Sequence, residues 1–245
     1  MDYSLSIPLL QRLAERYETA DFIKGDPSWF MHQVSGAANQ ETLDFIASCL
    51  SYGSRKQFFP KIQFILDSSY GDVHQWLMTG KYKRSISDNN NCYYRLYTCH
   101  DMIAMLNTLH DMIEEYNTIG NFLKANAHTG YEAVKAFTEY FQKNGATPIL
   151  PHSATSACKR ICMYLRWMVR DNSPVDLGLW TFIDKRTLIM PLDTHVMHEA
   201  CNLGFMNSHN TNMNTALKLT AVMSHIFPND PLKGDFALFG LGINK

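Results

Sequence analysis

The chain has 245 residues, of which 46% are hydrophobic and 12% aromatic, and its formal net charge is −1. This composition is ample for a buried core in one large domain or two joined lobes, and it excludes a polycationic molecule. Any binding of nucleic acid must therefore come from a local basic patch. We find no signal-peptide pattern and no apolar run near the roughly 18 residues of a membrane helix, so we expect a cytoplasmic, nucleoid-associated protein.

The cysteines and histidines argue against a metal or cofactor. The six cysteines contain no CxxC pair, which favours small buried thiols in a reducing compartment over a zinc site or an iron–sulfur cluster. The ten histidines show no HExxH or similar spacing of metal ligands. We therefore expect no metal, no iron–sulfur cluster and no other cofactor.

Apolar residues recur at helical spacing along most of the chain, and no stretch shows the sustained alternation of a strand. The expected helices, in chain order, cover residues 5–17, 27–33, 41–53, 56–67, 73–78, 93–116, 118–123, 131–143, 153–170, 194–203, 212–227 and 231–241. The helix over 41–53 has little polar surface and is expected in the core. Residues 81–91 form a polar loop. The class is therefore all-α.

Two segments of the sequence are expected to lie next to each other. The first, SATSACKRICMYLRWMVR, begins at Ser153 as a candidate helix cap and places Lys159 one turn into an amphipathic helix. The second, LIMPLDTHVMHEACNLGF, ends a short extended run at Asp193 and then begins a helix. Asp193 or Thr194 would cap that helix by accepting a hydrogen bond from a free backbone amide. We expect Lys159 and Asp193 to share one cleft, with the lysine as nucleophile and the aspartate as its electrostatic and proton-handling partner.

Four strings resemble the helix-hairpin-helix DNA glycosylases. PLDTHV resembles the segment that carries the catalytic aspartate, and the Lys159 helix resembles the helix that carries the Schiff-base lysine. The other two strings are DFIASCLSYGSR and DFALFGLG. Over nearly its full length the chain also resembles a bacterial family known as DUF2400. The glycosylase resemblance implies two helical lobes with a cleft between them, and it maps catalysis onto Lys159 and Asp193.

The chain departs from the superfamily in two places. The glycine-containing hairpin that normally precedes the lysine is replaced by ILPHSATSACK, which has no glycine. The connection from Lys159 to Asp193 is long, as in the archaeal 8-oxoguanine DNA glycosylases. Lys185, eight residues before Asp193, is the alternative nucleophile.

The remaining site residues follow from what such an enzyme must do. A damaged base has to leave the stack and be held, so we expect a base pocket or wedge from Tyr52, Ser54, Met163 and Trp167. Contacts to the DNA backbone are expected from Arg55, Lys56, Arg160, Arg166, Arg170, Thr194 and His195. An amine attacks only when it is neutral, and the apolar flanks of Lys159 together with Arg160 and Arg166 favour that form.

The resulting expectation is a monomeric base-excision repair enzyme acting on duplex DNA. It would be a DNA glycosylase with AP-lyase activity on an oxidised purine such as 8-oxoguanine, with one lobe over residues 1–40 plus 171–245 and the other over 41–170, which ends in the Lys159 helix. The alternatives are a non-catalytic DNA- or RNA-binding protein on the same fold, and a fold diverted to a small molecule.

Overall fold

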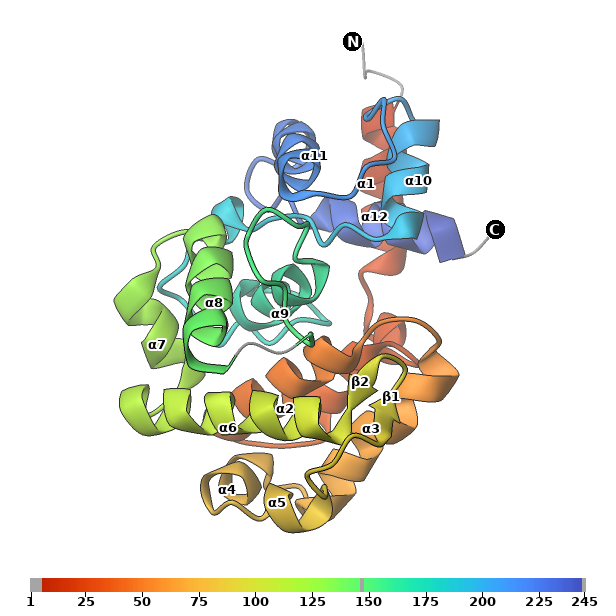
Figure 1. Cartoon of the computed structure of the whole chain (residues 1–245). Helices are drawn as coiled ribbons and strands as arrows, with labels where there is room; N and C mark the ends of the chain where they lie inside the picture. The colour runs from red at the N-terminus through yellow and green to blue at the C-terminus, as the bar shows by residue number, and fades with distance from the viewer. Residues whose placement is uncertain (1–5, 146–147, 244–245) are drawn as a thin grey trace. The chain divides into compact units, whose positions relative to one another are not determined.

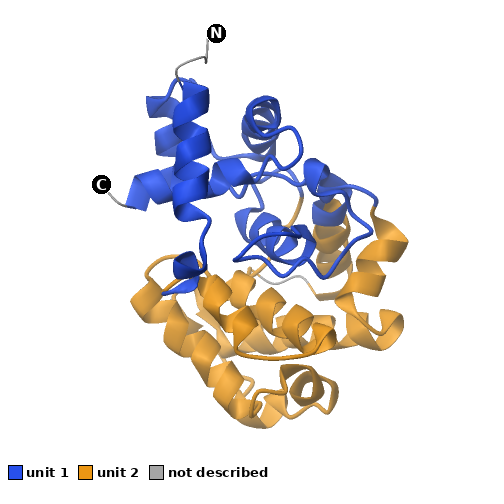
Figure 2. Cartoon of the chain, turned by 180° about the vertical axis from the view of Figure 1, so that it is seen from behind, with its two compact units in different colours: residues 1–24, 128–134, 154–245 blue, residues 25–127, 135–153 orange. Residues whose placement is uncertain are grey.

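The computed structural model describes residues 6–145 and 148–243, and these are mostly helical with one small two-stranded sheet (Figure 1). The all-α expectation is therefore confirmed at the level of class. The chain divides into two compact units (Figure 2). Unit 1 comprises residues 1–24, 128–134 and 154–245, and unit 2 comprises residues 25–127 and 135–153.

This division differs from the expected one at three points. Residues 25–40 belong to unit 2, the helix that carries Lys159 belongs to unit 1 with both chain ends, and residues 128–134 also belong to unit 1. The second difference has a clear cause. Two arginines on that helix, Arg166 and Arg170, form ion pairs with acids that flank or lie in the last helix.

Unit 1 is built around its last helix. Its helices are α1 (Ser6–Tyr17), η1 (Ala20–Ile23), α9 (Lys159–Val169), η3 (Lys185–Thr187), α10 (Thr194–Asn202), α11 (Met213–Ile226) and α12 (Lys233–Ile243). Helix α12 packs against α1 and α10. The approach to α1 is close, because a Cβ on Gly240 would lie 2.3 Å from ring atoms of Tyr17. Phe22 adds an edge-to-face contact with Phe236, at 4.9 Å between ring centroids.

Unit 2 is built around α2 (Ala37–Leu50), which is buried continuously from Glu41 to Leu50, as its sequence predicted. Around it lie η2 (Pro27–His32), α3 (Arg55–Ser68), α4 (Val73–Met78), α5 (Tyr82–Ser85), α6 (Cys99–Tyr116), α7 (Ile119–Asn126) and the part of α8 (Gly130–Gly145) that follows residue 134. Phe45 of α2 stacks on Phe137 and Phe141 of α8 at 5.4 and 5.5 Å between centroids. Ring stacking therefore ties α8 to the buried helix.

The expected helix over 93–116 is wrong at its start. A hairpin of β1 (Cys92–Tyr94) and β2 (Tyr97–Thr98) occupies its first turn, and α6 begins only at Cys99. Thr98 and Asp101 form a capping box, in which each side chain accepts a hydrogen bond from the other residue's backbone N–H. This cap fixes the start of α6, since it satisfies amides that have no partner within the helix.

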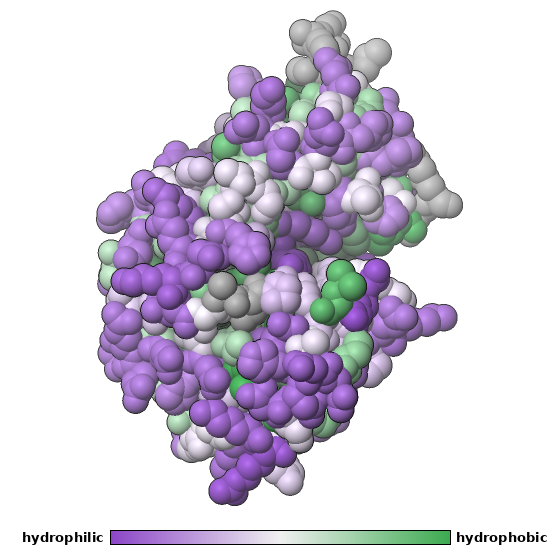
Figure 3. Space-filling model, in the orientation of Figure 1, coloured by the Kyte–Doolittle hydropathy of each residue, from purple (hydrophilic) through white to green (hydrophobic). Residues whose placement is uncertain are grey.

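Within residues 6–145 and 148–243, no helix is both long and apolar enough to cross a bilayer. On the face shown in Figure 3, hydrophilic residues dominate and hydrophobic ones form small separate groups.

One acid lies in the apolar interior of unit 2. Asp44 on α2 is 0% exposed, and neither of its carboxylate oxygens has a hydrogen-bond partner. Burial without compensation raises the pKa of Asp44 well above its ordinary 3.8. The folded protein therefore keeps a proton on Asp44 that the unfolded chain releases.

This proton makes a testable contribution to stability. At pH values above the ordinary pKa of 3.8 and below the raised pKa of the folded state, the folded protein binds more protons at Asp44 than the unfolded chain does, so raising the pH across this range favours unfolding at this residue. In urea titrations, the unfolding free energy of Asp44→Asn minus that of the wild type should grow by up to about 1.4 kcal/mol per pH unit. The control is Asp67→Asn, at an exposed position of α3. A difference for Asp44→Asn that stays constant across this range would contradict a buried neutral acid.

Candidate functional site

Asp193 lies where a buried extended segment meets α10. Residues 188–192 are all buried, and Asp193 follows them in an extended conformation. Its Oδ1 accepts a hydrogen bond of 2.8 Å from the backbone N–H of Val196, so Asp193 is the cap of α10, as predicted. A negative charge is favoured at a helix N-terminus, because the free amides there carry partial positive charge. The cap uses Oδ1 and leaves Oδ2 for another partner.

Lys159 is the first residue of α9, not a residue one turn inside it. Ser153 is therefore not the helix cap. The preceding residues pair instead with the start of α11, through a β-bridge between Ser156 and Asn212 and a 3.1 Å hydrogen bond from Met213 N to Thr155 O. Cys158 then turns the chain into α9 with a left-handed conformation, φ 44°. The position of Lys159 thus depends on a conformation that residues with side chains adopt at a cost.

The structure brings the two side chains together. Lys159 Nζ lies 3.3 Å from Asp193 Oδ2, and the side chains are 34% and 13% exposed. The pair is thus reachable from solvent while most of the carboxylate is shielded. Lys185, the alternative nucleophile, lies on η3 and pairs with Asp171.

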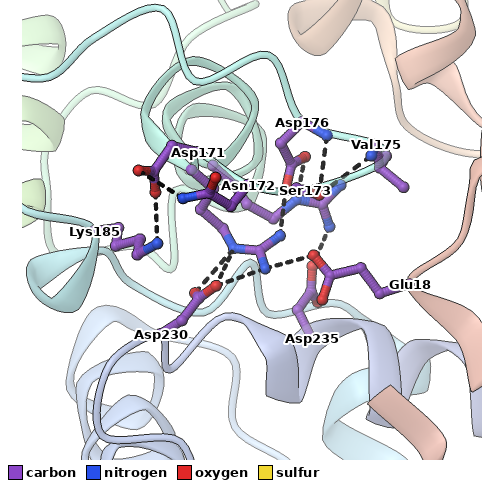
Figure 4. A network of polar contacts seen from close by, with 11 residues as sticks. Glu18, Asp171, Asn172, Ser173, Val175, Asp176, Lys185, Asp230 and Asp235 are labelled. Carbon is purple, nitrogen blue, oxygen red and sulfur yellow. Dashed lines mark hydrogen bonds and ion pairs between the residues drawn. The ribbon is translucent and has the colours of Figure 1, made fainter. Parts of the chain in front are cut away.

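Two buried arginines, Arg166 on α9 and Arg170 directly after it, bind a network of acids (Figure 4). Arg166 binds Asp176 through Nε at 3.1 Å and Asp235 through Nη1 at 2.5 Å. Arg170 binds Asp230, with Nε to Oδ1 at 2.9 Å, and Glu18, with Nη2 to Oε1 at 2.7 Å. Its Nη1 also donates to Asp176.

The chain after α9 folds back along the helix, which explains how Asp176 returns to it. The backbone N–H groups of Leu177 and Trp180 donate to the carbonyls of Trp167 and Met168, both at 2.8 Å. Ser173 Oγ accepts from the N–H of Asp176 at 3.2 Å and shapes the turn. Hydrogen bonds of the local backbone therefore hold Asp176 in its position beside the arginines.

The network contains more acids than arginines, and one of these acids has a raised pKa. The pKa of Asp235 is raised to about 6, mainly by burial and also by the negative charge of Asp193, against the lowering effects of Arg166 and Lys159. Asp235 is thus electrostatically coupled to the Lys159–Asp193 pair as well as bonded to Arg166. For Arg170, burial lowers the pKa, but Asp176, Asp230 and Glu18 raise it more, so the guanidinium stays charged.

Four of the predicted site residues on α9 or directly after it are structural. Arg166 and Arg170 are buried and neutralised by carboxylates, so the prediction that they contact phosphate is wrong. Arg166 is likewise no uncompensated cation beside Lys159. Trp167 is 0% exposed and Met163 is also buried, so in this structure both are core residues and neither lines a base pocket. The apolar face of α9 packs into unit 1, and the arginines extend that packing because their charges are paired.

The other predicted residues remain accessible. Thr194 and His195 are exposed in the first turn of α10, directly after Asp193, and Arg160 is partly buried beside Lys159. Unit 2 holds Tyr52, Ser54, Arg55 and Lys56; Tyr52 is partly buried, and the other three are exposed at the start of α3. Their roles toward DNA stay predictions.

Sequence reasoning missed the acids of the network. Asp235 lay in the string DFALFGLG, where one acid opens an otherwise apolar helix, and that contrast was a usable signal. Two arginines four residues apart in the apolar α9 were the complementary signal, since a buried arginine requires acids. Glu18 and Asp230 lie in turns and gave no comparable sign.

None of the six cysteines forms a disulfide, and Cys49, Cys158 and Cys162 are buried, as predicted. Cys92 is exposed and Cys99 and Cys201 are partly buried, so the prediction of buried thiols is wrong for these three. Among the described residues, one group could offer three ligand atoms to a metal: His110, Asp111 and Glu114, on the solvent side of α6. Their donor atoms lie within 4.8 Å of one another. Exposed acids commonly gather in this way without a metal, so we assign the group no role.

Comparison with known families decides the affiliation. The model of the family described as "Protein of unknown function (DUF2400)" matches residues 26–244. The chain belongs to this family. Comparison with curated proteins gave no match, and comparison with solved structures gave none. The family match covers both units, including α9 and the Asp193 segment.

The importance of the buried network for stability can be tested with Arg170→Met. This change leaves Glu18, Asp176 and Asp230 buried around an apolar side chain, which should cost about 3–5 kcal/mol. Arg160→Met on the same helix is the control and should cost less than about 1 kcal/mol, because Arg160 is partly exposed. Urea unfolding at pH 7 measures both. Equal costs for the two variants would contradict a network that supports unit 1.

A second test concerns the turn before Lys159. At a left-handed position alanine is strained and glycine is not, so Cys158→Gly should exceed Cys158→Ala in unfolding free energy by about 1 kcal/mol. At Cys162, inside α9, the order should reverse by a similar amount, about 1 kcal/mol, because glycine is unfavourable within a helix. Finding alanine better at both positions would show that Cys158 does not adopt this conformation in solution.

Proposed function

We propose that this protein is a base-excision repair DNA glycosylase with AP-lyase activity, in which Lys159 is the nucleophile and Asp193 its acid–base partner. One observation carries the proposal: the Lys159 amine lies 3.3 Å from Asp193 Oδ2, although the two residues belong to separate helices. These are the positions at which PLDTHV and the α9 segment resemble the catalytic aspartate and lysine of the helix-hairpin-helix glycosylases.

The geometry suits the first chemical step. A protonated amine cannot attack, and Asp193 Oδ2 is placed to take its proton. Asp193 Oδ1 accepts a hydrogen bond from the Val196 amide, so the carboxylate keeps its orientation while Oδ2 accepts and releases the proton. The free amine then forms a bond from Nζ to C1′ of the sugar as the bond from C1′ to the base breaks. The proton on Asp193 passes to the departing base.

The second step follows from the same pair. When the sugar ring opens, the C1′–O4′ bond breaks, a proton passes from the Lys159 nitrogen to O4′ through Asp193, and the nitrogen becomes part of a protonated Schiff base. Asp193 then takes a proton from C2′, a double bond forms between C2′ and C3′, and the bond from C3′ to the phosphate oxygen breaks, which cuts the strand. While it is unprotonated, Asp193 also stabilises positive charge that develops on the sugar, as carboxylates do in glycoside cleavage.

Two further observations support the assignment. Cys158 has a left-handed backbone conformation directly before Lys159, in the segment that replaces the superfamily's glycine-containing hairpin. A left-handed turn is thus present in this segment without glycine. The 8-oxoguanine preference rests on the long connection between Lys159 and Asp193, which resembles the archaeal branch. Unit 2 would supply DNA contacts through Ser54, Arg55 and Lys56, which are exposed at the start of α3.

Borohydride trapping tests the proposal. Borohydride reduces a Schiff base to a stable amine, so an enzyme of this kind becomes covalently attached to its DNA. We expect wild-type protein to form an adduct with duplexes that contain an abasic site or 8-oxoguanine, seen as a shifted band on a denaturing gel. Lys159→Ala should form none, and the matched variant Lys185→Ala should form as much as the wild type. Asp193→Asn should slow base release by about 10²–10⁴-fold.

The results separate the alternatives. An adduct lost in Lys185→Ala and kept in Lys159→Ala would move the nucleophile to η3. Binding to duplex DNA with no adduct on either substrate would leave a non-catalytic DNA-binding protein. Circular dichroism of each variant shows that a lost adduct does not reflect unfolding.

A further inference from the structure

Asp235 is a buried acid beside the candidate site that the proposed reaction does not use. It lies in the first turn of α12, its side chain is 7% exposed, and it accepts a hydrogen bond of 2.5 Å from Arg166 Nη1. The same guanidinium also binds Asp176 through Nε, so its positive charge is shared between two carboxylates. A buried carboxylate that shares its arginine is costly, and the packing of α12 alone does not explain it.

The face of α12 that carries Asp235 is turned toward the start of α10. Phe239 and Gly242 follow Asp235 at the spacing of one helix face. Both contact His195, two residues after Asp193: the Phe239 ring lies 6.2 Å from the His195 ring between centroids, and a Cβ on Gly242 would lie 3.0 Å from His195 Cβ. Helix α12 therefore packs this face against the first turn of α10, where Asp193 is the cap.

The face of α9 that begins with Lys159 reaches the same carboxylate. Cys162 and Arg166 follow Lys159 after one and two helical turns, so the three side chains share one face. Arg166 ends this row and binds Asp235 on α12. Asp235 thus lies where the Lys159 face of α9 and the Asp193 end of α10 both meet α12.

The carboxylate interacts electrostatically with both members of the Lys159–Asp193 pair. The pKa of Asp235 is raised to about 6, mainly by burial and also by the negative charge of Asp193, against the lowering effects of Arg166 and Lys159. An attraction between two charges is mutual. Because charged Lys159 favours ionised Asp235, ionised Asp235 favours the ammonium form of Lys159 to the same extent.

We propose that Asp235 is a positioning residue for Lys159: held by Arg166, it supplies a second negative charge, beside that of Asp193, which favours the positively charged forms of the Lys159 nitrogen. At rest this form is the ammonium ion, and in the proposed reaction it is the protonated Schiff base. The inference rests on the proposed function for the Schiff base alone, since the resting amine is accessible to reagents without DNA. Asp235 is buried, so it acts through its charge and not by touching the substrate.

Other titratable groups near Asp235 must be told apart from it. Besides the acids of the network, the groups that face it from the neighbouring helices are Lys159, Cys162 and Arg166 on α9, Asp193 and His195 on α10, and Tyr17 on α1. Burial, Cys158 and Asp235 raise the pKa of the Cys162 thiol, which therefore stays neutral near pH 6. Histidine ordinarily titrates near pH 6.5, so His195 is the competing group.

Labelling with a trace of acetic anhydride tests the proposal without DNA, because the reagent acetylates an amine only in its neutral form. The protein is labelled from about pH 5 to 10, and the peptide that contains Lys159 is quantified by mass spectrometry. In the wild type, the logarithm of the labelling rate should rise with pH but rise less steeply near pH 6, where Asp235 gains its charge. Below this bend the carboxyl group is neutral and no longer favours the ammonium form.

Three variants assign the effect. Asp235→Asn keeps an acceptor for Arg166 but removes the charge, so it should abolish the bend and speed the labelling of Lys159 at pH 7 about three- to tenfold. Asp235→Glu keeps the charge and should restore slow labelling. Asp230→Asn, the matched control, removes a buried acid of the same network that binds Arg170, and it should leave the Lys159 profile unchanged. Circular dichroism checks that each variant is folded.

Four results would overturn the role of Asp235. They are equal labelling of the wild type and Asp235→Asn, an equal acceleration with Asp230→Asn, a bend that persists in Asp235→Asn and disappears in His195→Gln, and, where Asp235→Asn does not fold, a wild-type profile without a bend. The two proposals fail separately. A covalent adduct with DNA but no effect of Asp235 on labelling would keep the glycosylase and remove this role, whereas the labelling effect without an adduct would do the reverse.

Discussion

The buried pairing of Arg166 and Arg170 with four carboxylates is the interaction on which the architecture of unit 1 depends. Two guanidinium groups on one helix bind acids from the turn after α1, the turn after α9, the turn before α12 and α12 itself. A buried charge without a partner is very costly, so these segments must assemble together. The network thus joins the beginning and the end of the chain to α9, which explains why unit 1 contains both.

The same network supports the candidate site. Lys159 begins the helix whose later turns carry the two arginines, and Asp193 caps a helix that packs on α12. The position of the amine relative to the carboxylate is therefore set by three helices held by paired charges. Asp235 connects the two regions, because it bonds to Arg166 and interacts electrostatically with Asp193 and Lys159. A site built on such a scaffold is held in place more precisely than one on loops.

Unit 2 is held together mainly by apolar packing and not by a network of buried charges. Its central helix α2 is buried on nearly all sides, and the aromatic stacking of Phe45 on α8 is apolar. Among the buried polar residues of α2, Asp44 is accommodated by keeping its proton and not by pairing. Strain and charge appear instead at the surface, where Arg95, Gly53 and Tyr52 fix the turn between β1 and β2. The residues that we propose to act on DNA lie at the starts of helices in both units.

The sequence alone determined the helical class, the burial of α2 and the cap at Asp193, because apolar periodicity and capping residues are local signals. It also identified Lys159 and Asp193 as partners, since their segments resemble one motif set. Only the tertiary structure decided that α9 starts at Lys159, that Arg166 and Trp167 are buried, and that Cys92–Thr98 is a hairpin. The amphipathic pattern of α9 predicts which of its residues share a face. It does not predict whether the face with the arginines lies in water or against buried acids. That choice depends on Glu18, Asp230 and Asp235, which are distant in the chain and meet α9 only after folding.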